Sequence, residues 1–216
     1  TASSTRGIWA GGYTGSPQTG IEYVTISSTG NAVSFGSLTS GRWGVAACSN
    51  GTRGVFMGGT LGPGTITLGE NFIEYVTIAS TGNAVDFGDL NYEPGAAKGI
   101  ESSVRALCAG GYDDVANSHT NRIDFITMSS TGNATDFGDL SQSRTGSRGN
   151  VNSSVRGIFG GGRNPLVLSV STIDYITIAS TGNAVFFGDL TKDRQGAAGA
   201  STQIRGVFAG GAEYTP

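Results

Sequence analysis

Aromatic and polar side chains gather in the segments of this chain that differ most between its internal repeats. Trp43, Tyr92, Tyr13 and Tyr112 can stack on flat rings such as those of sugars. Hydrogen-bonding groups follow soon after the last of these aromatic residues, namely Asp113, Asp114, His119 and Asn121. These residue types are candidates for a ligand-binding surface with a carbohydrate as the ligand. The alternative is that they are ordinary surface residues, since single exposed aromatic side chains are common in proteins.

Catalytic and metal chemistry have little support in the sequence. Because His119 is the only histidine, multi-histidine metal sites are excluded and no second histidine is left to act as a base. The pair Asp113 and Asp114 falls short of the roughly six to eight oxygen ligands that Ca²⁺ requires. Other carboxylate pairs, such as Asp86 with Asp89, recur from repeat to repeat, which is not the pattern of paired glycosidase acids. The sequence therefore predicts a protein that is not an enzyme and has no cofactor and no metal.

Two charged positions recur in nearly every repeat, and we predict a structural role for both. An arginine begins one strand of each repeat, at Arg6, Arg53, Arg105, Arg156 and Arg205. An aspartate follows Phe-Gly near the end of three repeats, at Asp89, Asp139 and Asp189, and Ser37 takes its place in the first. The arginines are expected to bind an asparagine or backbone carbonyls at a nearby turn, and the aspartates to fix the turn that follows them.

The elements that must position these residues are short strands. One phrase occurs four times, at 21–38, 73–90, 123–140 and 173–190. Each copy alternates apolar and polar residues, turns at Thr-Gly-Asn and alternates again, which is typical of a β-hairpin. Gly and Asn suit the turn because both tolerate a positive φ.

A second phrase, which starts with the recurring arginine and ends in Gly-Gly, occurs five times, and a stretch of small residues precedes its last four copies. Four strands therefore recur about every fifty residues, which is the period of a β-propeller blade. The small residues fit an innermost strand, which is crowded near a central axis. The expected core between blades consists of Trp9, Phe56, Phe159, Phe208, Tyr23, Tyr75, Phe125, Tyr175, Phe35, Phe87, Phe137 and Phe187.

We predict a single all-β domain over residues 1–216. It is expected to be a propeller of four-stranded antiparallel blades, with repeat modules near 1–38, 44–90, 95–140 and 146–190 and closing strands at 196–211. Four blades are favoured, with the N- and C-terminal strands paired to close the ring. Because both terminal phrases compete for one position in such a ring, the alternatives are a displaced end, a fifth and incomplete blade, or a spare strand that pairs with another chain.

The topology also sorts the loops. The turns between first and second strands and between third and fourth strands lie on one rim, where Ser-Thr-Gly-Asn repeats almost unchanged. The other loops lie on the opposite rim and differ between modules, and they include Arg42 with Trp43, Tyr92 with Glu93, 142–144 and 192–194. A surface that varies on a constant scaffold favours recognition, and drift in unconstrained loops is the alternative.

Composition narrows the class of protein. Charged residues make up 13% of the chain and the net charge is −3, with no basic cluster, so we predict no nucleic-acid binding. No apolar run approaches the roughly 20 residues of a membrane helix, so no membrane insertion is predicted. Cys48 and Cys108 are expected to be buried free thiols rather than a disulfide.

The order of strands resembles the kelch repeat, with a small-residue strand, a strand that ends in Gly-Gly, a tyrosine-containing strand and an aromatic strand. Gly-Gly at 58–59, 110–111 and 161–162 carries this resemblance, whereas Phe87, Phe137 and Phe187 stand where the family has tryptophan. The phrase Ile-Asp-Tyr-Ile-Thr-Ile-Ala-Ser-Thr-Gly-Asn-Ala at 173–184 is similar to repeats in tail-fibre and other virion proteins of marine bacteriophages, cyanophages among them.

This second resemblance implies a virion structural protein, a tail fibre or decoration located on the extracellular particle. Its expected partners are other virion proteins or a glycan or protein of the host cell surface, and a homo-oligomer could form through the spare terminal strand. The alternative is a secreted, lectin-like carbohydrate-binding propeller. A hydrolase or oxidase on the same scaffold is a distant third.

Overall fold

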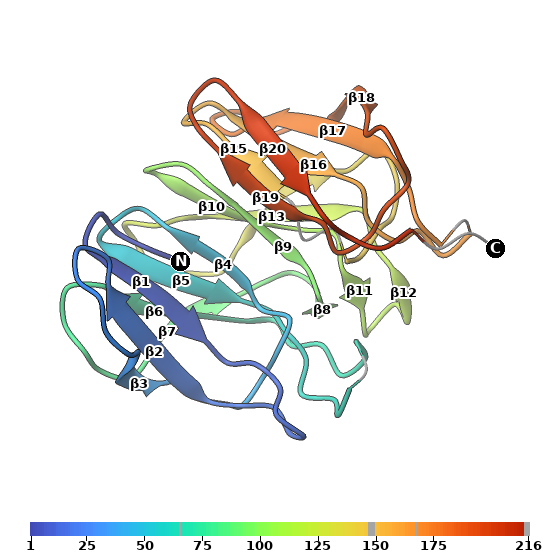
Figure 1. The fold of residues 1–216 in the computed structure, drawn as a ribbon. Coiled ribbons are helices and arrows are strands. Elements are labelled where there is room, and N and C mark those ends of the chain that lie inside the picture. Colours follow the sequence, from blue (N-terminus) through green and yellow to red (C-terminus); the bar gives the residue numbers. More distant parts are fainter. Residues whose placement is uncertain (65, 147–149, 167, 214–216) are drawn as a thin grey trace.

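The structure is a computed structural model that describes residues 1–64, 66–146, 150–166 and 168–213. The described residues form strands in six antiparallel sheets and contain no helix (Figure 1). The prediction of an all-β, antiparallel protein is therefore confirmed. Residues 147–149, which belong to the predicted module 146–190, lie outside the described residues, as do residues 65 and 167 of two variable loops.

Each repeat folds into one sheet whose strands follow chain order. The first two sheets consist of β1 (Arg6–Ala10), β2 (Gly20–Thr25) and β3 (Val33–Ser37), and of β4 (Ala46–Ser49), β5 (Arg53–Met57), β6 (Phe72–Thr77) and β7 (Val85–Asp89). The next two consist of β9 (Lys98–Glu101), β10 (Arg105–Ala109), β13 (Arg122–Thr127) and β14 (Thr135–Asp139), and of β15 (Asn150–Asn152), β16 (Arg156–Gly160), β17 (Thr172–Thr177) and β18 (Val185–Asp189). We call these four sheets modules 1 to 4.

Two smaller sheets complete the described strands. β19 (Ala198–Ser201) pairs only with β20 (Gly206–Ala209). A three-stranded sheet of two-residue strands joins two loops, and it contains β8 (Pro94–Gly95), β11 (Tyr112–Asp113) and β12 (Ser118–His119).

The third and fourth strands of each module share one irregularity. The register shifts between Ile73 and Glu74 of β6, where the partner strand β7 passes through Gly88, and the same shift recurs in the other three modules. Gly88 has φ 145°, a conformation that side chains rarely adopt. The recurring Phe-Gly-Asp-Leu phrase therefore encodes a β-bulge at a fixed place in every module.

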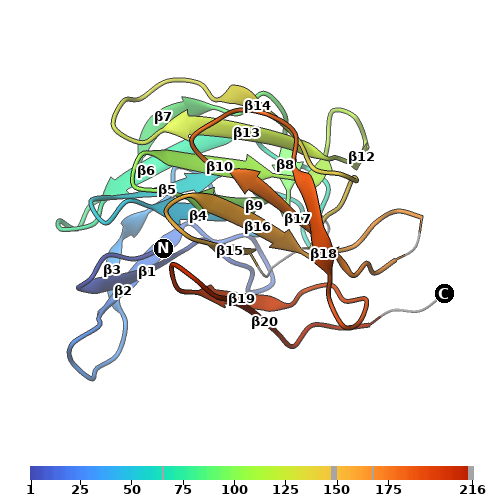
Figure 2. The same ribbon diagram turned by 90° about the horizontal axis from the view of Figure 1, so that it is seen from above.

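The modules follow one another so that their first strands lie side by side. β4 contacts β9, β9 contacts β15 and β15 contacts β19, and these strands are seen together in the view from above (Figure 2). The spacing is close, because a Cβ added to Gly99 of β9 would lie 2.6 Å from the carbonyl oxygen of Ala47 in β4. Small residues are required here for that reason, as the sequence predicted.

Three hydrophobic cores lie between the four modules. Between modules 1 and 2 the core includes Ile8, Phe35 and Phe56, and equivalent residues fill the two spaces that follow. In each module a third-strand aromatic ring meets the fourth-strand phenylalanine edge-on, at centroid distances from 5.8 Å for Tyr23 and Phe35 to 6.1 Å for Tyr175 and Phe187. Each module thus buries one face of its sheet against the next module.

The two ends of this series are open, which corrects part of the predicted core. Trp9 is 61% exposed and Phe187 is 52% exposed, whereas their equivalents Phe56 and Phe137 are buried. The reason is that no sheet of the described residues packs on the outer face of module 1, and the short β19–β20 pair covers module 4 only in part.

The described strands do not form a closed ring. Thr1 exchanges backbone hydrogen bonds with Ile8, so the N-terminal residues supply a short first strand to their own module. β19 and β20 contact β15, and no strand pairing of the described residues joins them to module 1. The predicted pairing of N- and C-terminal strands is therefore not present in this arrangement.

Cys48 and Cys108 are both buried and free, and burial raises the pKa of the Cys108 thiol to about 12. Neither thiol is therefore reactive at neutral pH. Within the described part of the chain, no helix has the length and apolar character needed to cross a membrane.

Candidate functional site

The variable loops are tied to one another in pairs, and these pairs build one rim of the molecule. Each loop that enters a module forms a short antiparallel bridge with the loop that follows the Gly-Gly of that same module. The bridged pairs are Trp43 with Thr60, Gly95 with Tyr112, Thr145 with Arg163, and Gln195 with Ala212. We call this surface the variable rim. Its loops are held by backbone pairing at equivalent positions, so their side chains can differ without loss of the frame.

A cavity of about 290 Å³ lies where these loops converge. Residues from all four entering loops line it, and they occupy equivalent positions in their modules. The lining residues include Trp43, Ala96, Thr145, Arg163 and Gln195. We call this cavity the rim pocket. It offers one large aromatic ring, one exposed guanidinium and one amide, which is the set of groups that bind polar ring-shaped ligands.

Trp43 is held in place from two sides. Its indole Nε1 donates a hydrogen bond of 2.8 Å to the carbonyl of Gly62, and its ring centroid lies 6.0 Å from that of Tyr13. Tyr13 itself is 42% exposed. The structure therefore brings two of the predicted ligand-binding aromatic residues together beside the rim pocket.

A second group of predicted residues lies in and beside the β11–β12 hairpin and does not line the rim pocket. The rings of Tyr112 and His119 meet edge-on at 5.8 Å, and His119 Nδ1 lies 3.3 Å from the carbonyl oxygen of Arg163. Burial lowers the pKa of His119, so its ring is neutral near pH 7. Asp113 is buried and accepts a hydrogen bond from the backbone of Val115. These contacts fix the position of the β11–β12 hairpin on the variable rim.

The other two polar residues of this group differ in their contacts. Asn121 donates from its side chain to the carbonyl of Leu140 at 3.4 Å. Asp114 is half-buried at the tip of the hairpin, where its carbonyl accepts a hydrogen bond from Asn117. Neither residue lines the rim pocket.

Tyr92 was expected on the exposed rim, and this expectation is wrong. It is buried, and its hydroxyl donates to the carbonyl of Gly110 at 3.0 Å. Burial raises the pKa of this hydroxyl well above its usual value. The same carbonyl position in module 4 and after β20 receives an arginine, since Arg144 donates to Gly161 and Arg194 donates to Gly210. Tyr92 therefore replaces a structural arginine and cannot stack on a ligand.

Buried ion pairs lie directly beneath the variable rim, and the sequence analysis missed them. Arg42 pairs with Glu74, and Arg144 pairs with Asp174, with all four side chains almost excluded from solvent. Burial lowers the pKa of both guanidinium groups, and the partner carboxylates oppose this shift. Each arginine precedes a module and each acid lies on the third strand of that module, so the pairs fix the start of the module to its sheet. The signal was an acid at one place in every third strand with an arginine at one place in three entering loops.

The opposite rim carries the predicted structural arginines. Arg6, Arg53 and Arg105 each donate to a backbone carbonyl at the end of the third strand of the next module. The acceptors are Ile78, Met128 and Ile178, at 2.7 to 2.9 Å. Arg156 and Arg205 have no such partner among the described residues, because no third strand follows them.

The recurring aspartates act through their backbone rather than their side chains. The N–H groups of Ser37, Asp89 and Asp139 donate to the side-chain oxygens of Asn83, Asn133 and Asn183, in the turn of the next module. In the described residues the carboxylates of Asp89 and Asp139 have no hydrogen-bond partner, and that of Asp189 contacts only Ser171. The predicted side-chain role of these aspartates in fixing a turn is therefore not seen.

No cluster of three or more histidine, cysteine or acidic residues suited to a metal ion occurs in the described residues. What the described rim pocket offers is hydrogen bonding, stacking and the exposed guanidinium of Arg163. Such a surface can bind a ligand.

Comparison with known proteins supports the fold. No family model matches the chain, and no curated protein does. The solved structure of YjhT is similar, with a TM-score of 0.72 at 10% sequence identity. The alignment covers 89% of this chain and 66% of that one, so this chain spans somewhat less than two thirds of the length of YjhT. At this identity the likeness concerns the arrangement of strands alone.

Proposed function

We propose that the four modules and the β19–β20 pair are blades of a kelch-like β-propeller, and that the chain is a non-enzymatic binding scaffold. The support is the side-by-side order of the innermost strands and the repeated packing of one sheet face on the next. The position of β19 beside β15 favours the five-blade alternative over the four-blade ring, since the closing strands add a further, incomplete blade.

The scaffold belongs, on this proposal, to a bacteriophage virion, as part of a tail fibre or decoration on the extracellular particle. Its variable rim binds a glycan or protein of the host surface, or another virion protein. The resemblance of the repeated phrase to virion proteins of marine bacteriophages favours this placement. This proposed binding role involves no cofactor, no nucleic acid and no membrane.

One observation carries the binding role. The rim pocket of about 290 Å³ lies where the loops of modules 2, 3 and 4 and of the β19–β20 pair converge, and the side chains at its equivalent bridge positions differ in size and chemistry. Trp43, Gly95, Thr145 and Gln195 are equivalent bridge positions, yet only Trp43 is aromatic. Side chains that differ between modules are thus held on loops that the same backbone bridges position, and such an arrangement favours recognition of a ligand.

The test is ligand binding by the purified chain on a glycan array, followed by titration with each glycan retained. We expect Trp43→Ala and Arg163→Ala each to weaken binding at least tenfold, because stacking and a charged hydrogen bond are lost. Trp9→Ala is the matched control, since Trp9 is the other tryptophan of the chain, is exposed and does not line the rim pocket. Trp9→Phe also leaves Trp43 as the only tryptophan, so a ligand in the rim pocket should change the remaining fluorescence.

A chain that binds no glycan and no host cell, or whose binding ignores both rim substitutions, would contradict the binding role. The virion placement is tested separately by mass spectrometry of purified phage particles. Presence of the chain in particles supports the virion protein, and presence only in the medium supports the secreted, lectin-like alternative.

A further inference from the structure

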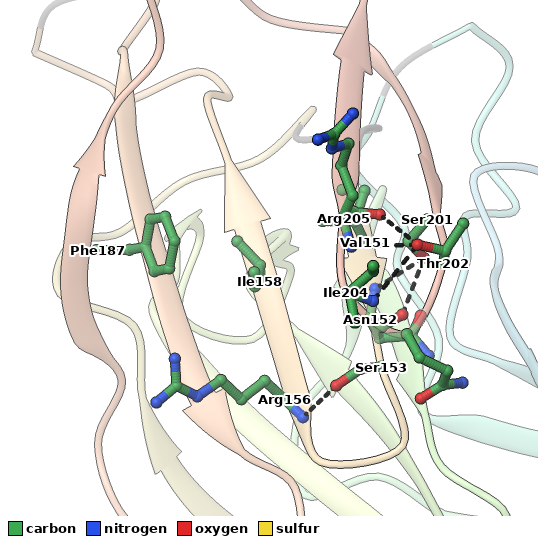
Figure 3. Close-up of a pocket in the computed structure, with 12 residues that line it drawn as sticks. Val151, Asn152, Ser153, Arg156, Ile158, Phe187, Ser201, Thr202, Ile204 and Arg205 are labelled. Atoms are coloured by element: carbon green, nitrogen blue, oxygen red, sulfur yellow. Dashed lines mark hydrogen bonds between the residues drawn. The ribbon is translucent and has the colours of Figure 1, made fainter.

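The sheet of β19 and β20 lacks the third and fourth strands that modules 2 to 4 have, so the edge of β20 is unpaired among the described strands. A cavity of about 260 Å³ lies between module 4 and the β19–β20 pair, and its lining includes Ile158, Phe187 and Ile204 (Figure 3). In modules 1 to 3 the equivalents of Phe187 are buried under the third and fourth strands of the next module. The β19–β20 pair supplies only the first and second strands of such a module, so the apolar face of module 4 is left uncovered.

The contacts that join consecutive modules are the same at all three junctions. An arginine and a backbone N–H of one module donate to the next module, at the end of its third strand and at the asparagine of its Thr-Gly-Asn turn. Two N–H groups of that turn region donate to two carbonyls of the first module. At the junction of modules 3 and 4, for example, Arg105 donates to Ile178, and the N–H of Asp139 donates to Asn183. In return the N–H groups of Gly182 and Ala184 donate to Phe137 and Asp139.

The two ends of the chain carry the two unused halves of this junction. At the end of module 4, Arg156 is exposed, and within the described part of the chain its side chain has no carbonyl to bind and the N–H of Asp189 has no asparagine. At the start of module 1, Asn31 is exposed and accepts no hydrogen bond from any described residue. Val24, Ile26 and Ala32 stand where Val76, Ile78 and Ala84 of module 2 are buried against module 1, and Ile26 is 56% exposed.

The unpaired charges at the two ends are also complementary. Arg194 occupies the position of Arg42 and Arg144, and it already donates to Gly210 as Arg144 donates to Gly161, but no acid of the described residues pairs with it. Glu22 occupies the position of Glu74 and Asp174, is exposed, and has no arginine among the described residues. A junction between the two ends would form the ion pair that both lack.

We propose that the β2–β3 hairpin of a second copy of this chain docks beside β20 and completes the unfinished module, with Glu22 of that copy paired to Arg194. For this to occur, β20 takes the place of β1 along the edge of β2. The two strands are interchangeable, because Arg-Gly-Val-Phe-Ala-Gly-Gly at 205–211 differs from Arg-Gly-Ile-Trp-Ala-Gly-Gly at 6–12 only in two apolar residues. β1 lies at the edge of its three-stranded sheet, so the exchange breaks its pairing with β2 and its contacts to module 2, through Ile8 and Arg6, and leaves the β2–β3 pairing in place.

The contact joins unlike ends, so it is head-to-tail and repeats from copy to copy. Light scattering and sedimentation over a range of concentrations test it, and we expect species at multiples of 21.9 kDa. Glu22→Arg and Arg194→Glu should each weaken association at least tenfold, because two like charges then meet at the docking contact. The double variant Glu22→Arg with Arg194→Glu should regain most of the lost association.

Gly188→Ala provides a steric test at the same junction. A Cβ on Gly188 meets no atom within 4 Å in the single chain, whereas at its equivalent Gly138 it would lie 2.6 Å from the carbonyl of Gly182. We therefore expect Gly188→Ala to block association, because in the assembly its Cβ would meet the turn at Gly30 of the second copy. Circular dichroism and thermal unfolding establish that each variant is folded before its mass is measured.

A wild-type chain that stays at 21.9 kDa at every concentration would overturn the proposal. So would an assembly that neither the charge reversals nor Gly188→Ala weaken, and so would a double variant that associates no better than the two single variants. A negative result in these assembly experiments would not contradict ligand binding at the rim pocket, because Glu22, Gly188 and Arg194 do not line that pocket.

Discussion

Arg144 and Asp174 show what holds each module to its sheet at the scale of single residues. We expect Arg144→Met to lower the free energy of unfolding by about 3–5 kcal/mol, because Asp174 is then left charged and buried without a cationic partner, with only the hydrogen bonds from Ser141. Two backbone carbonyls, of Gly161 and Thr172, lose their donor as well. Urea unfolding followed by circular dichroism measures the loss.

Lys192 is the matched control for this change. It pairs with Glu213 at 3.4 Å, and both side chains are largely exposed. Because exposed pairs contribute about 0–1 kcal/mol, Lys192→Met should leave stability nearly unchanged. Equal effects of Arg144→Met and Lys192→Met would show that the buried pair is not what secures the module.

We expect the stability of the chain to depend on pH through Asp124. This residue occupies the position of Glu74 and Asp174, but its entering loop supplies no arginine. Its carboxylate accepts hydrogen bonds from the backbone and side chain of Asn91, but burial raises its pKa above the usual value. A raised pKa in the folded state means that Asp124 costs no stability below the unfolded value, and that stability is lost as the pH rises through the folded value. Asp124→Asn should therefore gain stability relative to wild type as the pH rises above about 4, the ordinary pKa of an aspartate.

Thermal unfolding across this pH range tests the prediction. Asp193→Asn, at an exposed position of an entering loop, is the control and should follow the wild-type curve. A constant difference between Asp124→Asn and wild type over the whole range would mean that Asp124 has the same pKa in the folded and unfolded chain.

Single residues were the hardest features to predict from the sequence. Tyr92 was assigned to the exposed rim because its loop varies, yet the carbonyl of Gly110 draws its hydroxyl into the interior. Arg42 and Arg144 were assigned to the same rim, although third-strand acids bind them beneath it. In both cases the deciding partner lies far along the chain, and no local pattern reports it.

At the scale of elements, the fourth strand of one module lies directly on the turn of the next. We expect Gly138→Ala to destabilise the chain by about 1–3 kcal/mol more than Gly188→Ala does. Both glycines have a φ that disfavours side chains, 139° and 153°, but only at Gly138 would the Cβ meet a carbonyl. The difference between the two variants in urea unfolding isolates the steric contact from the backbone strain, and equal losses would mean that strain alone governs this position.

The elements themselves were largely predictable. Period-two alternation and the Thr-Gly-Asn turn gave the hairpin of each module, because these signals are local. The function of the asparagine was not predictable in the same way. It caps an N–H of the preceding module, as Asn133 does for Asp89, so its partner lies 44 residues away.

For the whole molecule, the structure implies that stability falls toward the C-terminal end. The strands of modules 2 and 3 are packed on both faces, whereas β19 is exposed throughout and β20 nearly so. We expect the amides of β20 to exchange with solvent at least tenfold faster than those of β5 or β10, which occupy the same place in their modules. Hydrogen–deuterium exchange at low protein concentration measures this, and equal protection of the three strands would show that the β19–β20 pair is as firmly packed as a complete module.

The arrangement of whole modules was only partly predictable. Repetition indicated how many similar sheets to expect, and small residues such as Gly99 indicated which strands are crowded together. What happens at the ends was left open, because Arg6 and Arg205 begin nearly identical strands and the sequence alone does not rank two equal candidates for one position.

The identity of the three junctions has a consequence for how such a molecule changes over generations. Every junction uses the same arginine, asparagine and glycine contacts. A module of about fifty residues that is gained or lost by recombination in the middle of the gene would therefore still pack on its neighbours through these contacts. The size of the molecule can then vary in whole steps, while the loops of each unit mutate independently.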